Sequence, residues 1–140
     1  MKKNNTTSKY VFDLDRFSFD KYKLGYSPPK KSGGEGIINY ESGYNVCVDK
    51  KRVSSVSIYF SKDYGCYDEY KGVVVFNKKR HQFNMDTSFE DIVTIFGKPQ
   101  EHWNDGVEMC AIYSYSDEFI EIIWRVDGVQ KFGYISMEIN

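Results

Sequence analysis

Two stretches of this chain carry the same residue patterns in the same order. Phe12-Asp13-Leu14-Asp15 matches Phe83-Asn84-Met85-Asp86 as an aromatic, a polar, an aliphatic and an acidic residue. Ser18-Phe19-Asp20 then matches Ser88-Phe89-Glu90, and a glycine with a proline beyond it follows in both stretches. An aromatic residue, a turn and a second aromatic residue come next, at 40–44 and 115–119. The shared order indicates two degenerate copies of one structural unit.

The second copy predicts a short helix over 89–96. Ser88 is a natural N-cap, and the acids that follow it suit the positive end of the helix dipole. Gly97 and Pro99 end the helix, because glycine accepts a left-handed conformation and proline cannot continue the helical hydrogen bonds. Four apolar residues share one helical face: Phe89, Ile92, Val93 and Phe96. The shorter match from Ser18 to Gly25 predicts a helix of a turn or two.

Alternating apolar and polar residues predict antiparallel strands after each helix. Alternation puts Ile120, Ile122 and Trp124 on one buried face, and Asp127-Gly128 is a strong hairpin signal. The composition agrees, because the chain holds 23 valines and isoleucines and 24 aromatic residues but two leucines and one alanine. β-branched and aromatic side chains favour sheet, whereas alanine and leucine favour helix.

The sequence therefore predicts an α+β fold in which two tandem β-α-β3 repeats form one twisted antiparallel sheet. Short helices would pack on one face of that sheet and leave the other face partly open. Residues 1–9 are expected to be a flexible N-terminus, 10–60 the first repeat, 61–71 a tyrosine-rich linker and 72–140 the second repeat. At 140 residues the chain is expected to form one compact domain overall.

Several classes of protein have no support in the sequence. No run approaches the roughly 18 apolar residues of a membrane span, and the polar N-terminus shows no signal peptide, so a cytoplasmic location is expected. A net charge of −1 argues against nucleic-acid and membrane binding. His81 and His102 have no partner at metal-ligand spacing, and Cys66, the thiol expected to be most exposed, has no histidine near it in sequence. No metal, cofactor or enzymatic activity is expected, and the reactivity of Cys66 is left open.

Acidic residues gather in the second half of the chain. Residues 71–140 carry seven basic and eleven acidic side chains, whereas residues 1–70 carry twelve and nine. This pattern fits either a solvated sheet face or a surface that attracts a basic partner. Tyrosines in the linker and a tryptophan in a polar loop after the helix are residue types enriched at interfaces. The predicted protein-binding residues are Glu101, Trp103, Asp105, Asp117, Glu118, Glu121, Tyr64, Tyr67, Asp68 and Glu69.

A resemblance to known proteins adds to this prediction. The helix ending in Gly97-Lys98-Pro99, followed by a strand with Tyr113 and Tyr115 and two further strands, resembles the unit of the beta-lactamase-inhibitor-protein-like fold. That resemblance implies a curved sheet that grips another protein. By type, the chain is also similar to bacterial immunity proteins of polymorphic toxin systems, such as contact-dependent growth inhibition. Such a protein neutralises a toxin domain, here one expected to be basic, such as a nuclease, by covering it.

A second hypothesis from a different class remains open. The open sheet face would bind a small ligand or mediate assembly, including assembly of a homodimer. The residues expected to form that site are Tyr59, Tyr113, Phe119 and Tyr134. The sequence does not decide between a monomer and a dimer.

Overall fold

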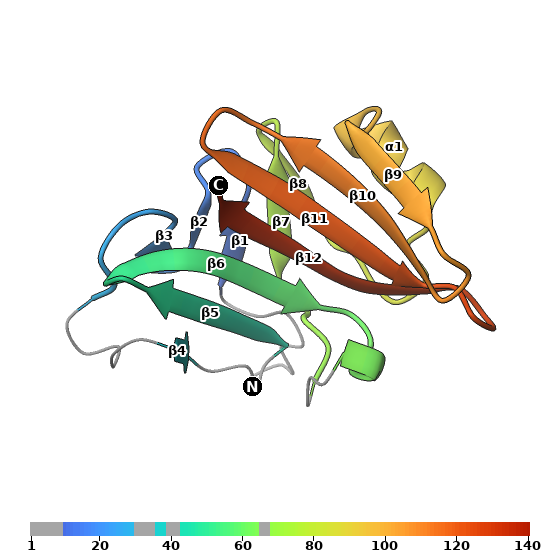
Figure 1. The fold of residues 1–140 in the computed structure, drawn as a ribbon, viewed down its shortest axis with the longest axis horizontal. Helices are drawn as coiled ribbons and strands as arrows, with labels where there is room; N and C mark the ends of the chain where they lie inside the picture. Colours follow the sequence, from blue (N-terminus) through green and yellow to red (C-terminus); the bar gives the residue numbers. More distant parts are fainter. Residues whose placement is uncertain (1–9, 30–35, 39–42, 65–67) are drawn as a thin grey trace, which may run out of the picture.

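The protein, known here from a computed structural model, is described over residues 10–29, 36–38, 43–64 and 68–140. Its described strands form two sheets (Figure 1). The larger sheet has seven strands, which in spatial order are β4 (Gly36–Ile38), β5 (Tyr44–Asp49), β6 (Arg52–Tyr59), β12 (Lys131–Ile139), β11 (Glu118–Arg125), β10 (Glu108–Ser114) and β9 (Glu101–Asn104). The smaller sheet has five, which are β3 (Tyr22–Lys23), β2 (Ser18–Phe19), β1 (Val11–Asp13), β7 (Val73–Phe76) and β8 (Lys79–His81).

The seven-stranded sheet joins the two halves of the chain through β6 and β12. Every neighbouring pair in this sheet is antiparallel, and Ile58 of β6 lies opposite Ile135 of β12. In the five-stranded sheet, β1 and β7 are parallel, with Phe12 opposite Val74. Long-range pairing in both sheets therefore holds the first and second halves together.

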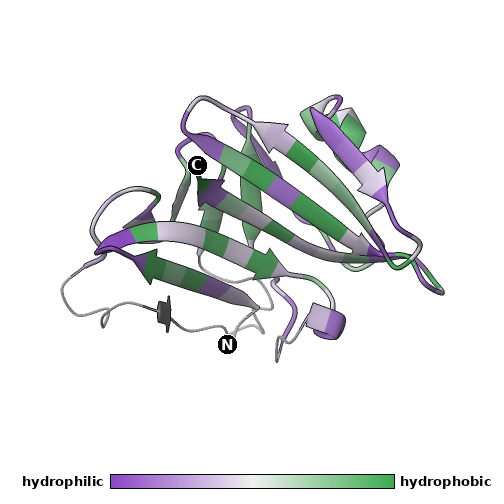
Figure 2. Ribbon diagram, in the orientation of Figure 1, coloured by the Kyte–Doolittle hydropathy of each residue, from purple (hydrophilic) through white to green (hydrophobic). Residues whose placement is uncertain are grey.

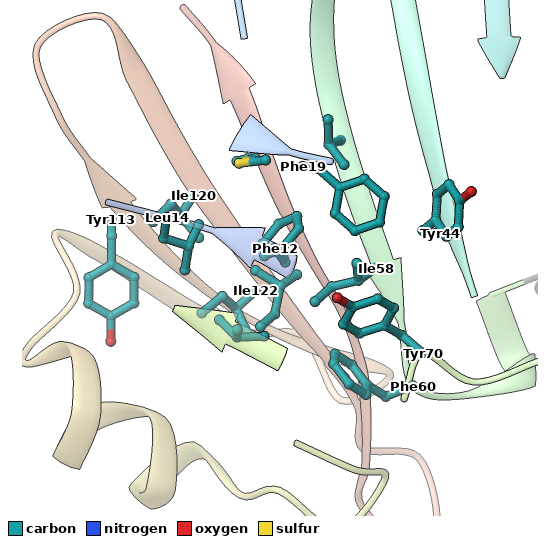
Figure 3. Packing of buried hydrophobic residues seen from close by; sticks show 14 of the residues in the cluster. Phe12, Leu14, Phe19, Tyr44, Ile58, Phe60, Tyr70, Tyr113, Ile120 and Ile122 are labelled. Atoms are coloured by element: carbon teal, nitrogen blue, oxygen red, sulfur yellow. The ribbon is translucent and has the colours of Figure 1, made fainter. Parts of the chain in front are cut away.

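The core lies between the two sheets (Figure 3). Phe12 and Phe19 from the smaller sheet are fully buried, as are Ile58 and Ile122 from the larger one. The Phe19 ring lies 4.7 Å from that of Tyr44 across the interface between the sheets. Because such aromatic side chains bury large apolar areas, they supply much of the hydrophobic stabilisation that holds the layers together.

The single α-helix of the described residues, α1 (Phe89–Phe96), begins and ends as expected. Ser88 caps it and forms a reciprocal capping box with Asp91. Gly97 ends it at a positive φ of 87°, although its ψ of −167° lies outside the left-handed helical region. The Phe89 ring packs 5.7 Å from Trp124, and the Phe96 ring 5.5 Å from Tyr113. The helix thus continues the layer of the smaller sheet and covers β10 and β11.

The predicted helix from Ser18 to Gly25 is wrong. This segment forms the tight hairpin β2–β3, and β2 pairs with β1 so that Phe12 lies opposite Phe19. Asp20 has a positive φ of 54°, which a right-handed helix excludes. A helix this short has a costly nucleus, whereas pairing with β1 satisfies the backbone and buries Phe19 in the core. Tertiary pairing therefore overrides the local cap signal.

The expectation of one sheet with a helix in each half is also wrong, since there are two sheets and one α-helix among the described residues. The second sheet forms because β1, β2, β3, β7 and β8 pair with one another and not with the strands of the larger sheet. The turn between β7 and β8 contains only Asn77 and Lys78, at φ values of 53° and 64°, the left-handed pair that a tight hairpin requires.

The expected buried face of β11 is confirmed. Ile120, Ile122 and Trp124 point into the core and are fully buried, and Figure 2 shows hydrophilic bands between pairs of hydrophobic ones along this strand. Asp15 supports the turn between β7 and β8, because it accepts hydrogen bonds from the amides of Asn77 and Lys78 at 2.7 and 2.8 Å. No helix in the described part of the chain is long and apolar enough to cross a membrane.

Candidate functional site

One face of the seven-stranded sheet points away from the five-stranded sheet, and we call it the outer face. Strand register places its side chains in rows that cross the sheet. The first row is Trp103, Cys110, Ile123, Tyr134 and Tyr59. The second row is Glu101, Ile112, Glu121, Ser136, Ser57 and Asn45. The third row is Ser114, Phe119, Glu138, Ser55 and Cys47.

Side-chain hydrogen bonds connect these rows. The Tyr134 hydroxyl donates to Glu121 Oε1 at 3.0 Å, and Asn45 Nδ2 donates to the Tyr59 hydroxyl at 2.8 Å. In the middle of the face, Ser57 donates to Ser136 at 2.9 Å, and Ser136 donates to Glu138 Oε2 at 3.1 Å. The tyrosine and carboxylate side chains are thereby held in fixed positions, which lowers the entropy that a partner would have to remove.

A short 3-10 helix, η2 (Lys62–Tyr64), packs against one end of the outer face. The Tyr64 hydroxyl donates to Glu108 Oε2 at 2.9 Å, and its ring meets that of Tyr134 edge-on at 5.3 Å. Lys131 and Asp63 form an ion pair at 3.6 Å beside this contact. These bonds place the linker tyrosine predicted as an interface residue on the same face as Glu121.

Negative charge dominates the outer face. Glu101, Glu108, Glu121 and Glu138 all lie there, and within the described ranges no cation forms an ion pair with any of them. Two basic residues share this face, Arg125 opposite Glu108 and Lys131 opposite Arg125, but their ion pairs are with Asp127 at 2.6 Å and with Asp63. The face therefore carries uncompensated carboxylates beside aromatic rings.

Burial and the negative charge of these carboxylates together raise the pKa values of neighbouring groups. Burial, and then the charges of Glu121, Glu101 and Glu108, raise the pKa of the Cys110 thiol to about 12. Burial, and then the Glu121 carboxylate, also raise the pKa of Tyr134 above its usual value. Burial raises the pKa of Glu138, with a further contribution from the charge of Glu121. The charge of Glu121 therefore contributes to the raised pKa values of all three groups.

Only some of the predicted binding residues meet on this face. Trp103 was expected in a loop but lies on the edge strand β9, with 41% of its surface exposed. A four-residue edge strand is polar because it meets water on both sides, so its sequence looks like a loop. Predicted residues that the structure brings onto the outer face are Glu101, Trp103, Glu121 and Tyr64.

The other predicted residues have different positions. Asp105 is a turn residue that accepts hydrogen bonds from the amides of Val107 and Glu108, and these bonds lower its pKa. Asp117 and Glu118 lie at the opposite end of the sheet, and alternation puts Glu118 on the inner face. Glu69 pairs with Lys71 at 4.0 Å, in the segment with Asp68 that runs past Gly43. Tyr67, like Cys66, lies outside the described residues.

The four aromatic residues expected to form a small-ligand or assembly site are divided between the two faces. Tyr59, Phe119 and Tyr134 lie on the outer face. Tyr113 is 3% exposed on the inner face, where its hydroxyl donates to the Gly97 carbonyl at 2.8 Å. Its assignment to the open face is therefore wrong.

The outer-face residues that sequence reasoning missed are Glu108, Glu138, Asn45, Ser57 and Ser136. Glu138 lies beside Phe119 only because β12 pairs with β11, and that pairing leaves no mark in the local sequence. The alternation of β12 is also interrupted, since Trp124 lies opposite Phe132 while Ile123 lies opposite Tyr134. Phe132 and Tyr134 are two residues apart and would share a face of a regular strand, but the bulge at Gly133 turns them to opposite faces.

Both histidines stack on phenylalanine rings. His81 stacks on Phe83 and His102 stacks on Phe89, with ring centroids 5.9 and 4.4 Å apart. Over the described parts of the chain, no three His, Cys, Asp or Glu side chains come together as metal ligands. Two cavities, of about 470 and 270 Å³, flank Gln82 and Phe83 and do not touch the outer-face tyrosines.

The structure thus defines a strand-rich protein with mixed α and β content and an acidic, aromatic sheet face. No family model matches the sequence, and no curated protein is similar to it. Among solved structures, the chain is similar to the crystal structure of a DUF4309 family protein, YjgB, from Bacillus subtilis subsp. subtilis str. 168. That similarity has a TM-score of 0.42 and 13% sequence identity, and it covers 81% of this chain and 72% of the other.

Proposed function

We propose that this protein is a non-enzymatic binding module whose outer face holds a basic protein partner. The observation that carries the proposal is the row in which Glu101 and Glu121 flank Ile112, with Trp103 beside them and no described cation in ion-pair contact with either carboxylate. Unpaired acids attract a basic surface over several ångströms, and a neighbouring aromatic residue supplies contact area once the partner has docked.

The immunity function expected from the sequence is the specific form of this proposal. A basic toxin domain, such as a nuclease, would dock on the outer face in the cytoplasm, and its active site would be covered. The hydrogen-bonded tyrosines support this proposal because a tight inhibitor profits from a face that is already ordered. The small-ligand alternative gains no support from the two cavities described above, because both flank Gln82 and Phe83 and lie away from the outer-face tyrosines.

The tandem-repeat origin belongs to the same proposal. Two meanders, β4-β5-β6 and β10-β11-β12, meet at β6 and β12, and this arrangement supports a duplicated unit. On this proposal, β9 and η2 are additions without a counterpart among the described residues at the β4 end, and both contribute to the acidic face.

The test uses the domain encoded by the neighbouring reading frame, which a toxin–immunity pair would place beside this gene. Association rates should be measured at low and high salt for the wild-type protein and for the Glu101→Gln/Glu121→Gln variant. We expect the variant to associate several-fold more slowly, with the difference shrinking at high salt because screening weakens the attraction. Glutamine keeps an acceptor for the Tyr134 hydroxyl, so the face stays folded.

The matched control is Asp86→Asn/Glu90→Gln, which removes the same charge beside α1 and away from the outer face. It should leave the association rate almost unchanged. Equal slowing by both variants would mean that net charge alone matters, and no slowing by the outer-face variant would refute the acidic site. A basic domain that kills cells and is not neutralised on co-expression would refute the immunity function.

A further inference from the structure

Strand β9 forms an edge of the seven-stranded sheet (Figure 1). All four of its residues are exposed, and β10 is its only strand partner among the described residues. Exposed edge strands are templates for pairing with another strand unless charge, proline or a covering segment prevents it. Edge pairing therefore depends on which backbone groups β9 leaves free.

The register of the β9–β10 hairpin identifies those groups. The Asp105 amide donates to the Glu108 carbonyl at 3.0 Å, so this opposed pair is hydrogen-bonded. Hydrogen-bonded and non-hydrogen-bonded pairs alternate along an antiparallel ladder. Trp103 and Glu101 therefore bond to β10, whereas the N–H and C=O groups of His102 and Asn104 point away from the sheet. Two residues of β9 thus offer a complete set of donors and acceptors to a further strand.

The side chains around this edge decide which strand fits. Glu101 is the first residue of β9, Asp105 follows its last residue, and Glu108 lies on the adjacent strand. Trp103 stands on the outer face next to the free edge. In a symmetric antiparallel pairing of two copies centred on Trp103, Glu101 of each copy would lie opposite Asp105 of the other. Like charges directly opposed are destabilising, so the charge pattern favours a basic strand over a second copy.

We propose that an extended, basic segment of the partner pairs with β9 as an additional strand, which rests on the proposed function because the acidic outer face supplies the charge complementarity. Backbone hydrogen bonds to His102 and Asn104 hold this segment in register. Its basic side chains face Glu101 and Glu108, and an apolar side chain packs on Trp103. Main-chain pairing supplies affinity in this mode, and the alternating side chains supply specificity.

The probe for this site is a synthetic peptide about ten residues long, so that it spans a typical strand. Every second residue is alternately lysine and valine and the residues between are threonine, so that lysine and valine share the face that meets Glu101 and Trp103. Fluorescence anisotropy should show that it binds the full-length protein, while the corresponding glutamate–valine peptide does not. The decisive comparison is His102→Pro with His102→Ala. Both variants lose the stacking of His102 on Phe89, but only proline removes the outward N–H, at an edge position where proline is tolerated.

We expect His102→Pro to bind the basic peptide about fivefold to tenfold more weakly than His102→Ala. Equal affinities of these two variants would overturn strand addition. Failure of the basic peptide to bind the wild-type protein would overturn it as well. A wild-type dimer that dissociates in His102→Pro would overturn the basic occupant and assign the edge to a second copy.

A second measurement leaves the protein unchanged and so does not depend on the folding of a proline variant. The same basic peptide, N-methylated at every second residue, can no longer pair along one of its edges. It should bind at least about fivefold more weakly, and binding of the unmodified peptide should protect the His102 and Asn104 amides from hydrogen exchange. Equal binding of the methylated peptide without protection of these amides would overturn the proposal.

Failure of strand addition and failure of the proposed function give different results. If Glu101→Gln/Glu121→Gln weakens binding of the neighbouring domain while His102→Pro and His102→Ala behave alike, the acidic face is retained and strand pairing is refuted. If the acid variant has no effect on that domain, the proposed function fails whatever the peptide does.

Discussion

The ring of Tyr64 lies over Gly133, so closely that a β-carbon built at Gly133 would come within 2.5 Å of Tyr64 Cε2. Gly133 is the extra residue of the bulge in β12, and Tyr64 donates to Glu108 from this position. The absence of a side chain at position 133 therefore allows η2 to dock on the outer face. In this way a linker residue contacts the acidic surface formed by the second half of the chain.

Replacing Gly133 with alanine should displace η2. We expect Gly133→Ala to destabilise the protein by about 1–3 kcal/mol, the usual cost of overpacking, in urea unfolding. The cost should be smaller in a Tyr64→Ala background, where the ring has been removed, although the Ile123 carbonyl at 2.9 Å still opposes the added methyl group. Equal costs in both backgrounds would show that Tyr64 does not pack on Gly133.

The two-residue turn between β7 and β8 predicts a stabilising substitution. Lys78 has a φ of 64°, a conformation that costs more free energy for a residue with a side chain than for glycine. The hydrogen bond from its backbone amide to Asp15 does not involve its side chain. Lys78→Gly should raise the free energy of unfolding by up to about 1 kcal/mol. The neighbouring Lys79→Gly, within β8, should lower it by about 0.5–1 kcal/mol. Destabilisation by both would contradict the observed turn.

Glu138 predicts a pH dependence of stability. Burial raises its pKa above the ordinary value of 4.5, so the folded state disfavours the charged form. This destabilisation is absent below the ordinary pKa and grows as the pH rises from the ordinary to the raised pKa, because the unfolded chain loses the proton first. Above the raised pKa it stays constant. Glu138→Gln should therefore be more stable than the wild type at pH 7. The advantage should shrink near pH 4 in denaturation curves, and a constant difference would contradict the raised pKa.

The two tryptophans should report on opposite faces of the sheet. Trp103 is exposed on the outer face, whereas Trp124 is fully buried and donates its indole N–H to the Thr87 carbonyl at 2.9 Å. Trp124→Phe should leave a fluorescence that iodide quenches readily, and should cost about 1–3 kcal/mol because a buried acceptor loses its donor. Trp103→Phe should leave a blue-shifted emission that iodide hardly affects and that no longer responds to a partner on the outer face.

Local sequence signals were sufficient where an element depends on its own residues. Ser88, Asp91 and Gly97 specify the limits of α1, because capping groups act within one turn of the helix. Alternation specifies which side of β11 is buried, and the surplus of β-branched and aromatic residues specifies a protein dominated by sheet. Glu101, Trp103 and Glu121 could likewise be named as interface candidates from their residue types alone.

The tertiary structure decided what depends on pairing between distant segments. The cap-like Ser18 begins a strand because β1 offers Phe19 a partner, and that burial outweighs the local cap signal. Glu138 joins Glu121 on one face because β12 pairs with β11, and the bulge at Gly133 separates Phe132 from Tyr134. The sequence by itself determined the helix, the strand content and the acidic character of the second half. Register, which is set by long-range hydrogen bonds and core packing, determined which acids and aromatic residues form one surface.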